Sequence, residues 1–283
     1  MSAQDLTPRA YWPAPKGTRI ASIGYVHVSG DTIPDPSLPI TGVDSKINSI
    51  RLGYLETVEL WGRTANIVLE LPYSDGTTKG TRDDNFDVER YYQGLGDVSA
   101  TVSVNLLGAP SMTKQDFALL RAEPRPIIGA SLKLVAPTGR YDSKRIINVG
   151  TNRWAARAEL GLVTPMGGRW MFEAALSGWA FADNNDFLGL TREQSPIAAV
   201  QAHVVHRFGP GFWASLDGSF YHGGRSKVGG RRLDDLQRDG KLGITLVFPI
   251  ARKHVLKASY STGSVNDSDE SFDTLLLGYS HIF

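Results

Sequence analysis

The chain ends in Thr274-Leu275-Leu276-Leu277-Gly278-Tyr279-Ser280-His281-Ile282-Phe283. Every second residue back from Phe283 is apolar or aromatic except His281, whereas the alternate residues include Ser280 and Gly278. This period of two predicts a β-strand with two different environments. The strand runs to the last residue, although the termini of soluble domains usually fray. A barrel in a membrane needs such a strand, because its last strand pairs with its first and leaves no edge unpaired in lipid.

Composition agrees with a barrel and excludes other classes. The 283 residues include 41% hydrophobic residues and no cysteine, and the net charge is +1. No stretch approaches the roughly 18 consecutive apolar residues of a membrane helix, which excludes a helical membrane protein. Strands of a barrel are polar at alternate residues where they face the lumen, so a modest hydropathy suits them. The near-neutral charge argues against nucleic-acid binding.

Internal stretches repeat the alternation. In Val98–Leu106 the even residues are apolar and the odd residues are polar, and Arg169–Phe181 alternates in a similar way. About twelve such segments have the length that a tilted spanning strand requires. We therefore predict an all-β fold, an antiparallel transmembrane β-barrel of about twelve strands.

The connections between these segments alternate in length. Short ones occur at Trp61–Arg63, Thr164–Gly168, Gly209–Gly211 and Pro249–Lys253. Long polar stretches occur at 29–46, 74–92, 137–151, 182–195, 223–238 and 263–272. Bacterial barrels have short periplasmic turns and long extracellular loops. We therefore expect the six long stretches outside the cell and both termini in the periplasm.

Two segments depart from this scheme. The connection Gly108–Pro126 is long where a periplasmic turn is expected, and Thr113–Asp116 resembles a helix N-terminus. We predict a short helix at the periplasmic mouth, either a partial cover or, as the favoured alternative, a packed connector. Residues 1–16 contain three prolines and cannot form a regular strand. We expect them to be an N-terminal extension, periplasmic or lumenal, and residues 17–283 to be a single barrel domain.

The start of the chain carries no apolar leader. Met1–Asp5 leads directly into polar residues and prolines. Outer-membrane proteins are exported with a leader that is removed, so we interpret the chain as the mature form of a bacterial outer-membrane protein. A cytoplasmic protein is the alternative.

Several local matches carry a family resemblance. They are Leu60–Ala65, Gly94–Asp97, Asn105–Pro110, Ala136–Asp142, Asn148–Trp154, Glu159–Gly161, Asp183–Phe187 and the C-terminal strand. In these segments the chain resembles a family of bacterial outer-membrane transporters associated with the meta-cleavage pathway of phenol degradation. The resemblance implies a barrel and the uptake of aromatic or other hydrophobic small molecules. It implies no catalytic or ligand-binding residues and no particular solute.

The polar faces of the predicted strands define a candidate lumen. Its residues are Arg51, Glu59, Glu70, Asp97, Lys133, Arg153, Arg157, Glu159, Glu173, Trp179, His203, Arg207, Trp213 and Asp217. Unpaired charges are costly in a narrow space of low dielectric, so many of these should pair. Register across the short turns places His203 opposite Asp217, Arg207 opposite Trp213, and Glu173 near Arg157 and Glu159. The charges either form a network that stiffens a closed barrel or line a path that selects solutes.

The two inward tryptophans admit two interpretations. Trp179 and Trp213 could lie near the same level and stack an aromatic solute, or they could belong to the aromatic girdle at the membrane interface.

Catalysis and metal binding are not favoured. His203 and Asp217 are two parts of a possible triad with Ser215 or Ser219, but they face the lumen, which is the wrong side for a lipid hydrolase. The acidic clusters Asp183–Asp186 and Asn266–Asp273 fit no standard calcium loop. We therefore predict no enzyme, no catalytic residues, no cofactor and no metal site.

The sequence thus predicts a monomeric channel for passive uptake of small organic solutes, aromatic or hydrophobic. The alternative is a closed structural or adhesion barrel that acts through its extracellular loops. The expected partners are the lipid bilayer, a small-molecule solute and, through the C-terminal strand, the barrel assembly machinery. Lipopolysaccharide is a further candidate partner, because extracellular cations could bind its phosphates; these are Arg140, Lys144, Arg145, Arg225, Lys227, Arg231 and Arg232.

Overall fold

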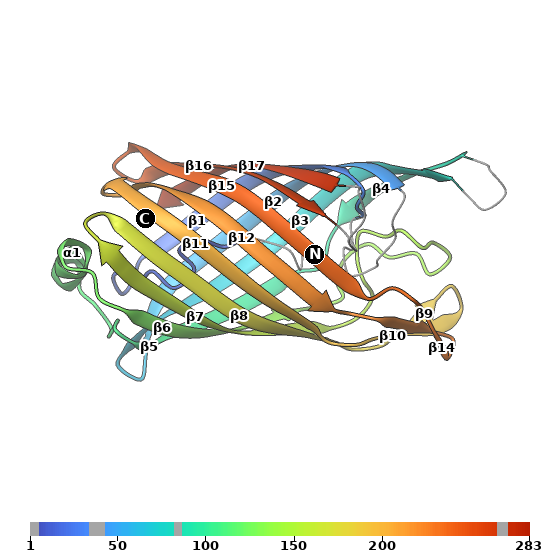
Figure 1. Ribbon diagram of the computed structural model, residues 1–283, viewed down its shortest axis with the longest axis horizontal. Coiled ribbons are helices and arrows are strands. Elements are labelled where there is room, and N and C mark those ends of the chain that lie inside the picture. The colour runs from blue at the N-terminus through green and yellow to red at the C-terminus, as the bar shows by residue number, and fades with distance from the viewer. Residues whose placement is uncertain (1–5, 34–42, 82–86, 265–270) are drawn as a thin grey trace.

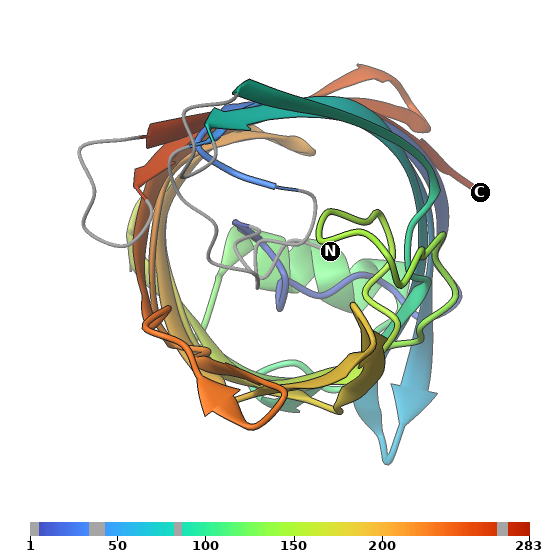
Figure 2. The ribbon, with the colours of Figure 1, turned by 90° about the vertical axis from the view of Figure 1, so that its right-hand side faces the viewer.

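The computed structural model describes residues 6–33, 43–81, 87–264 and 271–283. Over these residues the chain forms the predicted closed antiparallel barrel of twelve strands (Figures 1 and 2). The barrel strands are β1 (Arg19–Gly30), β2 (Val43–Leu60), β3 (Arg63–Thr81), β5 (Ser99–Leu107), β6 (Ile127–Val135), β7 (Ala155–Gly167), β8 (Trp170–Phe181), β11 (Ile197–Gly209), β12 (Phe212–Gly223), β15 (Gln237–Ala251), β16 (His254–Ser264) and β17 (Ser271–Ile282).

The C-terminal strand closes the barrel. β17 pairs with β1 from Ile20 opposite Ile282 to Gly30 opposite Phe272. The backbone N–H of Phe283 donates to the carbonyl of Arg19 at 3.0 Å, so the ladder reaches the last residue. The predicted role of the terminal strand is confirmed.

Each strand has an apolar face outside and a more polar face inside. On β5, Val102 and Leu106 are exposed, whereas Ser99, Ser103 and Asn105 are buried. Burial of polar residues and exposure of apolar ones is the reverse of a soluble protein and is expected where lipid surrounds the barrel. In the described parts of the chain, no helix has the length and apolar character needed to cross a membrane.

The short turns occur where the sequence predicts them. Between β2 and β3, Trp61 and Gly62 have φ of 52° and 71°, the left-handed conformation that a two-residue hairpin turn requires. Three more hairpins, β7–β8, β11–β12 and β15–β16, also have short turns. The Trp61 side chain is exposed, as suits an aromatic ring at a membrane interface.

Several of the long stretches contain more strand than their polar composition suggests. β3 continues beyond the barrel wall and pairs with β4 (Asp87–Leu95). β9 (Asn184–Phe187), β10 (Leu190–Gln194), β13 (Ser226–Val228) and β14 (Arg231–Arg232) form a second, four-stranded sheet. These strands lie beyond the lipid, so neither of their faces needs to be apolar. Alternation of apolar and polar residues therefore cannot reveal them. Parts of 29–46, 74–92 and 263–272, and most of Asn266–Asp273, lie outside the described residues.

The predicted helix is present as α1 (Lys114–Ala122), at the short-turn end of the barrel (Figure 1). Thr113 and Asp116 form a capping box, in which each side chain accepts a hydrogen bond from the backbone N–H of the other. Hydrogen bonds from the Thr113 hydroxyl and backbone hold the pKa of Asp116 below its usual value. Leu120 is buried in a cluster with Tyr11 and Met171, so α1 is packed against the short-turn mouth.

Candidate functional site

The described part of the N-terminal extension lies inside the barrel. Residues 6–16, here called the lumen segment, run within the ring of strands (Figure 2). The arginine, tyrosine and tryptophan in this segment, Arg9, Tyr11 and Trp12, contact inward side chains of β6, β7, β8, β11 and β12 or each other. The lumen is therefore filled partly by a separate piece of chain as well as by side chains of the wall.

Tyr11 fixes the lumen segment to the wall. Its ring rests on Gly129 and Gly161, which are cross-strand partners on β6 and β7. A Cβ at Gly129 would lie 2.2 Å from the Tyr11 ring, and one at Gly161 would lie 2.1 Å from it. The two glycines thus form a notch that only residues without a side chain can provide. The Tyr11 hydroxyl donates to Glu159 at 3.0 Å and is hydrogen-bonded to the Ser131 hydroxyl at 3.1 Å.

Arg9 makes a second attachment. Its backbone N–H donates to the Glu173 carboxylate at 2.6 Å. Its guanidinium lies 4.2 Å from the centre of the Trp12 ring and 5.9 Å from that of Trp213, close enough for cation–π attraction. The backbone N–H of Thr7 donates to the Gln201 side chain at 3.3 Å. Polar contacts and ring packing thus hold the segment in the lumen.

A buried polar cluster lies beside these attachments. His203 and Asp217 are cross-strand partners, as predicted, and the imidazole Nδ1 is 2.8 Å from the Asp217 carboxylate. The Thr245 hydroxyl donates to the other Asp217 oxygen at 2.8 Å. Glu173 lies opposite His203 on β8. We call Glu159, Glu173, His203, Asp217 and Thr245 the central polar belt.

One predicted pairing is wrong. The cross-strand partner of Glu173 on β7 is Val163, whereas Arg157 and Glu159 lie opposite Trp179 and Ser177. The sequence suggested a turn at Thr164–Gly168, but β7 continues through Pro165 to Gly167 with a bulge. The turn of the hairpin therefore lies farther along the chain than expected. Arg157 approaches Glu159 on its own strand at 3.7 Å.

Apolar clusters lie on both sides of the central polar belt. At the short-turn end, Trp12 and Trp213 pack against a cluster that includes Tyr11 and Leu120 of α1. At the other end, Trp179 packs with Ile197 and Tyr221. Buried apolar side chains thus occupy the lumen at two levels.

The prediction of two exposed indoles at one level is therefore wrong. Trp179 and Trp213 lie opposite Ile197 and Arg207, near opposite ends of β11. Only 2% of Trp179 is exposed. It is also stacked on Phe181, so neighbouring wall residues cover the ring that a solute would need to reach.

The other predicted lumen residues form smaller groups. Lys133 pairs with Glu70 at 2.6 Å, and Asp97 accepts from Gly139 and Thr151. Arg207 donates to the Arg121 carbonyl near the short-turn mouth. Three further residues occupy other levels of the lumen or its mouths: Arg51 lies on the inner face of β2, Glu59 is exposed at the end of β2 and pairs with Lys16, and Arg153 is buried and hydrogen-bonds Gln194.

The sequence did not point to Tyr11, Gly129 or Gly161. Because every second residue of a strand faces inward, the sequence could have placed both glycines on the inner face. The connection between β6 and β7 is long, however, so the sequence gives no register to make them partners. In the described residues, no group of three or more His, Asp or Glu side chains is arranged to hold a metal ion.

Comparison with solved structures agrees with the barrel. The chain is similar over 99% of its length to the whole (100%) of an outer membrane channel from Pseudomonas putida F1, with a TM-score of 0.77 and 20% identity. It also resembles the β domain of the Bordetella autotransporter BrkA, with a TM-score of 0.54, 12% identity and coverage of 95% and 100% of the two chains. A third similar structure is the transport unit of the Escherichia coli autotransporter AIDA-I, with a TM-score of 0.51, 11% identity and coverage of 99% and 93%. At these identities the similarity concerns the fold.

Comparison with curated protein sequences gave no match. A family model described as "Putative MetA-pathway of phenol degradation" matches residues 41–271, which is most of the barrel. The match covers the β2–β3 hairpin, the glycine notch, the central polar belt and most of the wall, so the chain belongs to this family.

Proposed function

We propose that the protein is an outer-membrane channel for passive uptake of small organic solutes, with aromatic compounds as the preferred class. The observation that carries this proposal is the construction of the lumen. The wall presents small or polar residues to the lumen, such as Gly129, Gly161, Ser131 and Thr245, and Tyr11 of the lumen segment occupies the notch that the two glycines leave. A barrel built only for rigidity would fill this space with wall side chains, as small barrels do.

Two further findings support the proposal. The family is described by a pathway of phenol degradation, and the Pseudomonas putida structure with the same fold is an outer membrane channel.

The closed structural barrel is the second candidate. Burial of the central polar belt and the two apolar clusters favours it, because both restrict the lumen. The two candidate functions differ in whether the lumen segment moves aside to let a solute pass.

We infer no catalytic role. The similar solved structures named above are a channel and autotransporter units. We also propose that the protein acts as a monomer. Lipopolysaccharide contact has weaker support, because three of the extracellular cations have acidic neighbours: Arg145 with Asp142, Lys227 with Glu193, and Arg225 with Asp234.

Solute flux tests the proposal. Purified protein in liposomes should accelerate entry of benzenesulfonate, an aromatic acid that stays ionised at neutral pH and therefore crosses lipid slowly. Protein-free liposomes and liposomes with heat-unfolded protein are the controls. Rates equal to both controls for benzenesulfonate and for neutral sugars would favour the closed barrel.

A further inference from the structure

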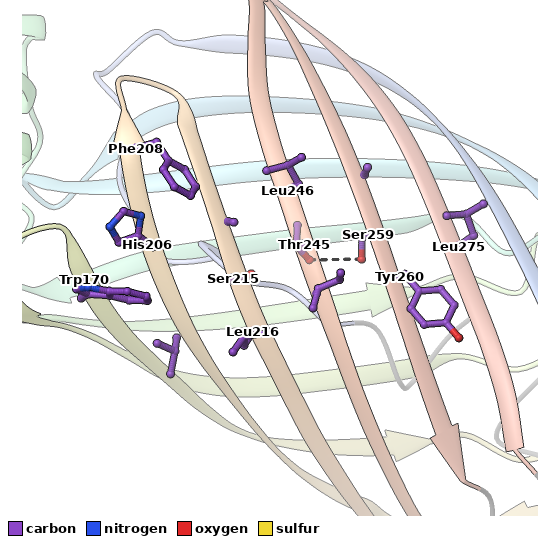
Figure 3. A pocket seen from close by; sticks show the side chains of 14 residues that line it. Trp170, His206, Phe208, Ser215, Leu216, Thr245, Leu246, Ser259, Tyr260 and Leu275 are labelled. Carbon is purple, nitrogen blue, oxygen red and sulfur yellow. Dashed lines mark hydrogen bonds between the residues drawn. The ribbon is translucent and has the colours of Figure 1, made fainter.

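A groove runs across the outer surface of the barrel wall, on the face toward lipid (Figure 3). It crosses from β8 to β17 and has a volume of about 750 Å³. This lies within the roughly 300–1,000 Å³ of pockets that hold drug-sized ligands. One wall is a row of cross-strand partners, Val204, Leu216, Ile244, Tyr260 and Leu275, whose side chains point outward.

Small side chains make the groove deep. The opposite wall is the next row of outward residues, in which Ala214 and Ala258 flank Leu246. Between the two walls, the backbone of Ser215, Thr245 and Ser259 forms the floor, while their side chains face the lumen (Figure 3). The groove is therefore a strip of thin, apolar wall between two raised rows.

One end of the groove is amphipathic. His206 lies between Trp170 and Phe208, with ring centres 4.5 Å and 4.6 Å apart. The exposed Arg169 donates from its guanidinium to the Phe208 carbonyl at 2.9 Å. Phe208 and Trp170 adjoin the short turns, so this end is at the membrane interface on the side that we assign to the periplasm. Aromatic rings and a cation at that depth match a lipid headgroup region.

We propose that the groove is a binding site for a phospholipid of the periplasmic leaflet. One acyl chain lies on the floor beside Ala214 and Ala258, and the phosphate meets Arg169 and the edge of the His206 ring. The occupant must satisfy both an apolar channel and a cation at one end only. A neutral aromatic solute such as toluene would satisfy the first requirement alone. The proposal does not depend on transport through the lumen.

Lipid titration followed by native mass spectrometry tests the site in detergent-purified protein. The probes are dioleoylphosphatidylglycerol and dioleoylglycerol, which has the same chains and no phosphate. Ala258→Leu raises the low wall and narrows the groove, and Arg169→Gln removes the cation. The chain offers matched controls. Ala100→Leu also adds bulk between two outward leucines, Leu69 and Leu134. Arg63 follows the short Trp61–Gly62 turn and also donates from its guanidinium to a backbone carbonyl, that of Leu106; Arg63→Gln removes this guanidinium.

Wild-type protein should bind one phosphatidylglycerol more tightly than any later one. Ala258→Leu should weaken the binding of this first phosphatidylglycerol about fivefold, which corresponds to about 1 kcal/mol. Arg169→Gln should weaken the binding of phosphatidylglycerol by a similar factor and leave the binding of dioleoylglycerol unchanged. Both control variants should bind both lipids as wild type does. Heat-modifiable migration checks folding, and if Ala258→Leu does not fold, Arg169→Gln with the two probes still decides. Equal affinities in wild type and Arg169→Gln would overturn the proposal, as would displacement of the lipid by toluene.

Discussion

Tyr11 shows how a single residue organises the lumen. Its ring occupies the notch of Gly129 and Gly161, and its hydroxyl donates to one oxygen of Glu159, a buried carboxylate. A carboxylate taken out of water is costly unless it is hydrogen-bonded. The contact therefore stabilises both parts of the structure. The wall holds the lumen segment in place, and the lumen segment supplies a hydrogen bond to a buried carboxylate of the wall.

Asp217 should be the most sensitive residue of the central polar belt. Asp217→Ala removes the acceptor of both His203 and Thr245 in a buried site. We expect a loss of roughly 3 kcal/mol in the free energy of unfolding, measured by urea titration of the barrel in lipid vesicles. Lys227→Ala breaks an exposed pair with Glu193 and should cost at most about 0.5 kcal/mol. A loss no larger than that of the control would contradict the importance of the belt.

Pairing of lumen residues could be predicted only across short turns. His203 and Asp217 are partners because the β11–β12 turn is short, so residue numbers alone fix the register. Gly129 and Gly161 are partners across a long connection, where chain length fixes nothing. The partner of Glu173 was predicted wrongly because β7 continues through Pro165 to Gly167, so the turn lies farther along the chain than a turn at Pro165–Gly168 would place it.

Among the strands, alternation of apolar and polar residues predicts a strand only where one of its faces contacts lipid. β5 and β8 have one apolar face because one side meets lipid, and the sequence predicted both. β9 and β10 lie beyond the barrel wall and carry polar residues on both faces, so the sequence suggested only a loop. Helix α1 was predictable from its capping box, because Thr113 and Asp116 are local neighbours.

The C-terminal strand should control assembly. Deleting Phe283 removes the last backbone hydrogen bond to Arg19 and an exposed ring that packs edge-on against His281. Because β17 closes the barrel, we expect less folded protein in the membrane, measured by heat-modifiable migration. Phe283→Tyr keeps the ring and the backbone and should assemble normally. Equal membrane levels of the deletion and wild type would count against this role.

At the scale of the whole molecule, the barrel is asymmetric. Short turns and α1 lie at one end, and the second sheet lies at the other (Figure 1). Sequence patterns predicted this asymmetry, because loop length can be counted. What fills the lumen could not be predicted, since residues 6–16 are irregular and are placed by contacts with five strands that are distant in sequence.

Orientation in the membrane can be tested by labelling, because the natural chain has no cysteine. Single cysteines at Lys144 and Arg232 should react with an impermeant thiol reagent on intact cells. Cysteines at Gly167 and Pro210 should react only after the outer membrane is opened. The reverse pattern would invert the topology and move the proposed phospholipid groove to the other leaflet.

We propose that the lumen is a solute path whose opening depends on the lumen segment. Single-channel recording of Gly161→Val in planar bilayers tests this, because any Cβ at Gly161 meets the Tyr11 ring and must displace it. Gly178→Val is the matched control, since a Cβ there meets no atom within 4 Å. We expect a larger conductance or a longer open time for Gly161→Val than for wild type and Gly178→Val, at equal amounts of folded protein. Identical currents from all three barrels, or no current from any of them, would contradict it.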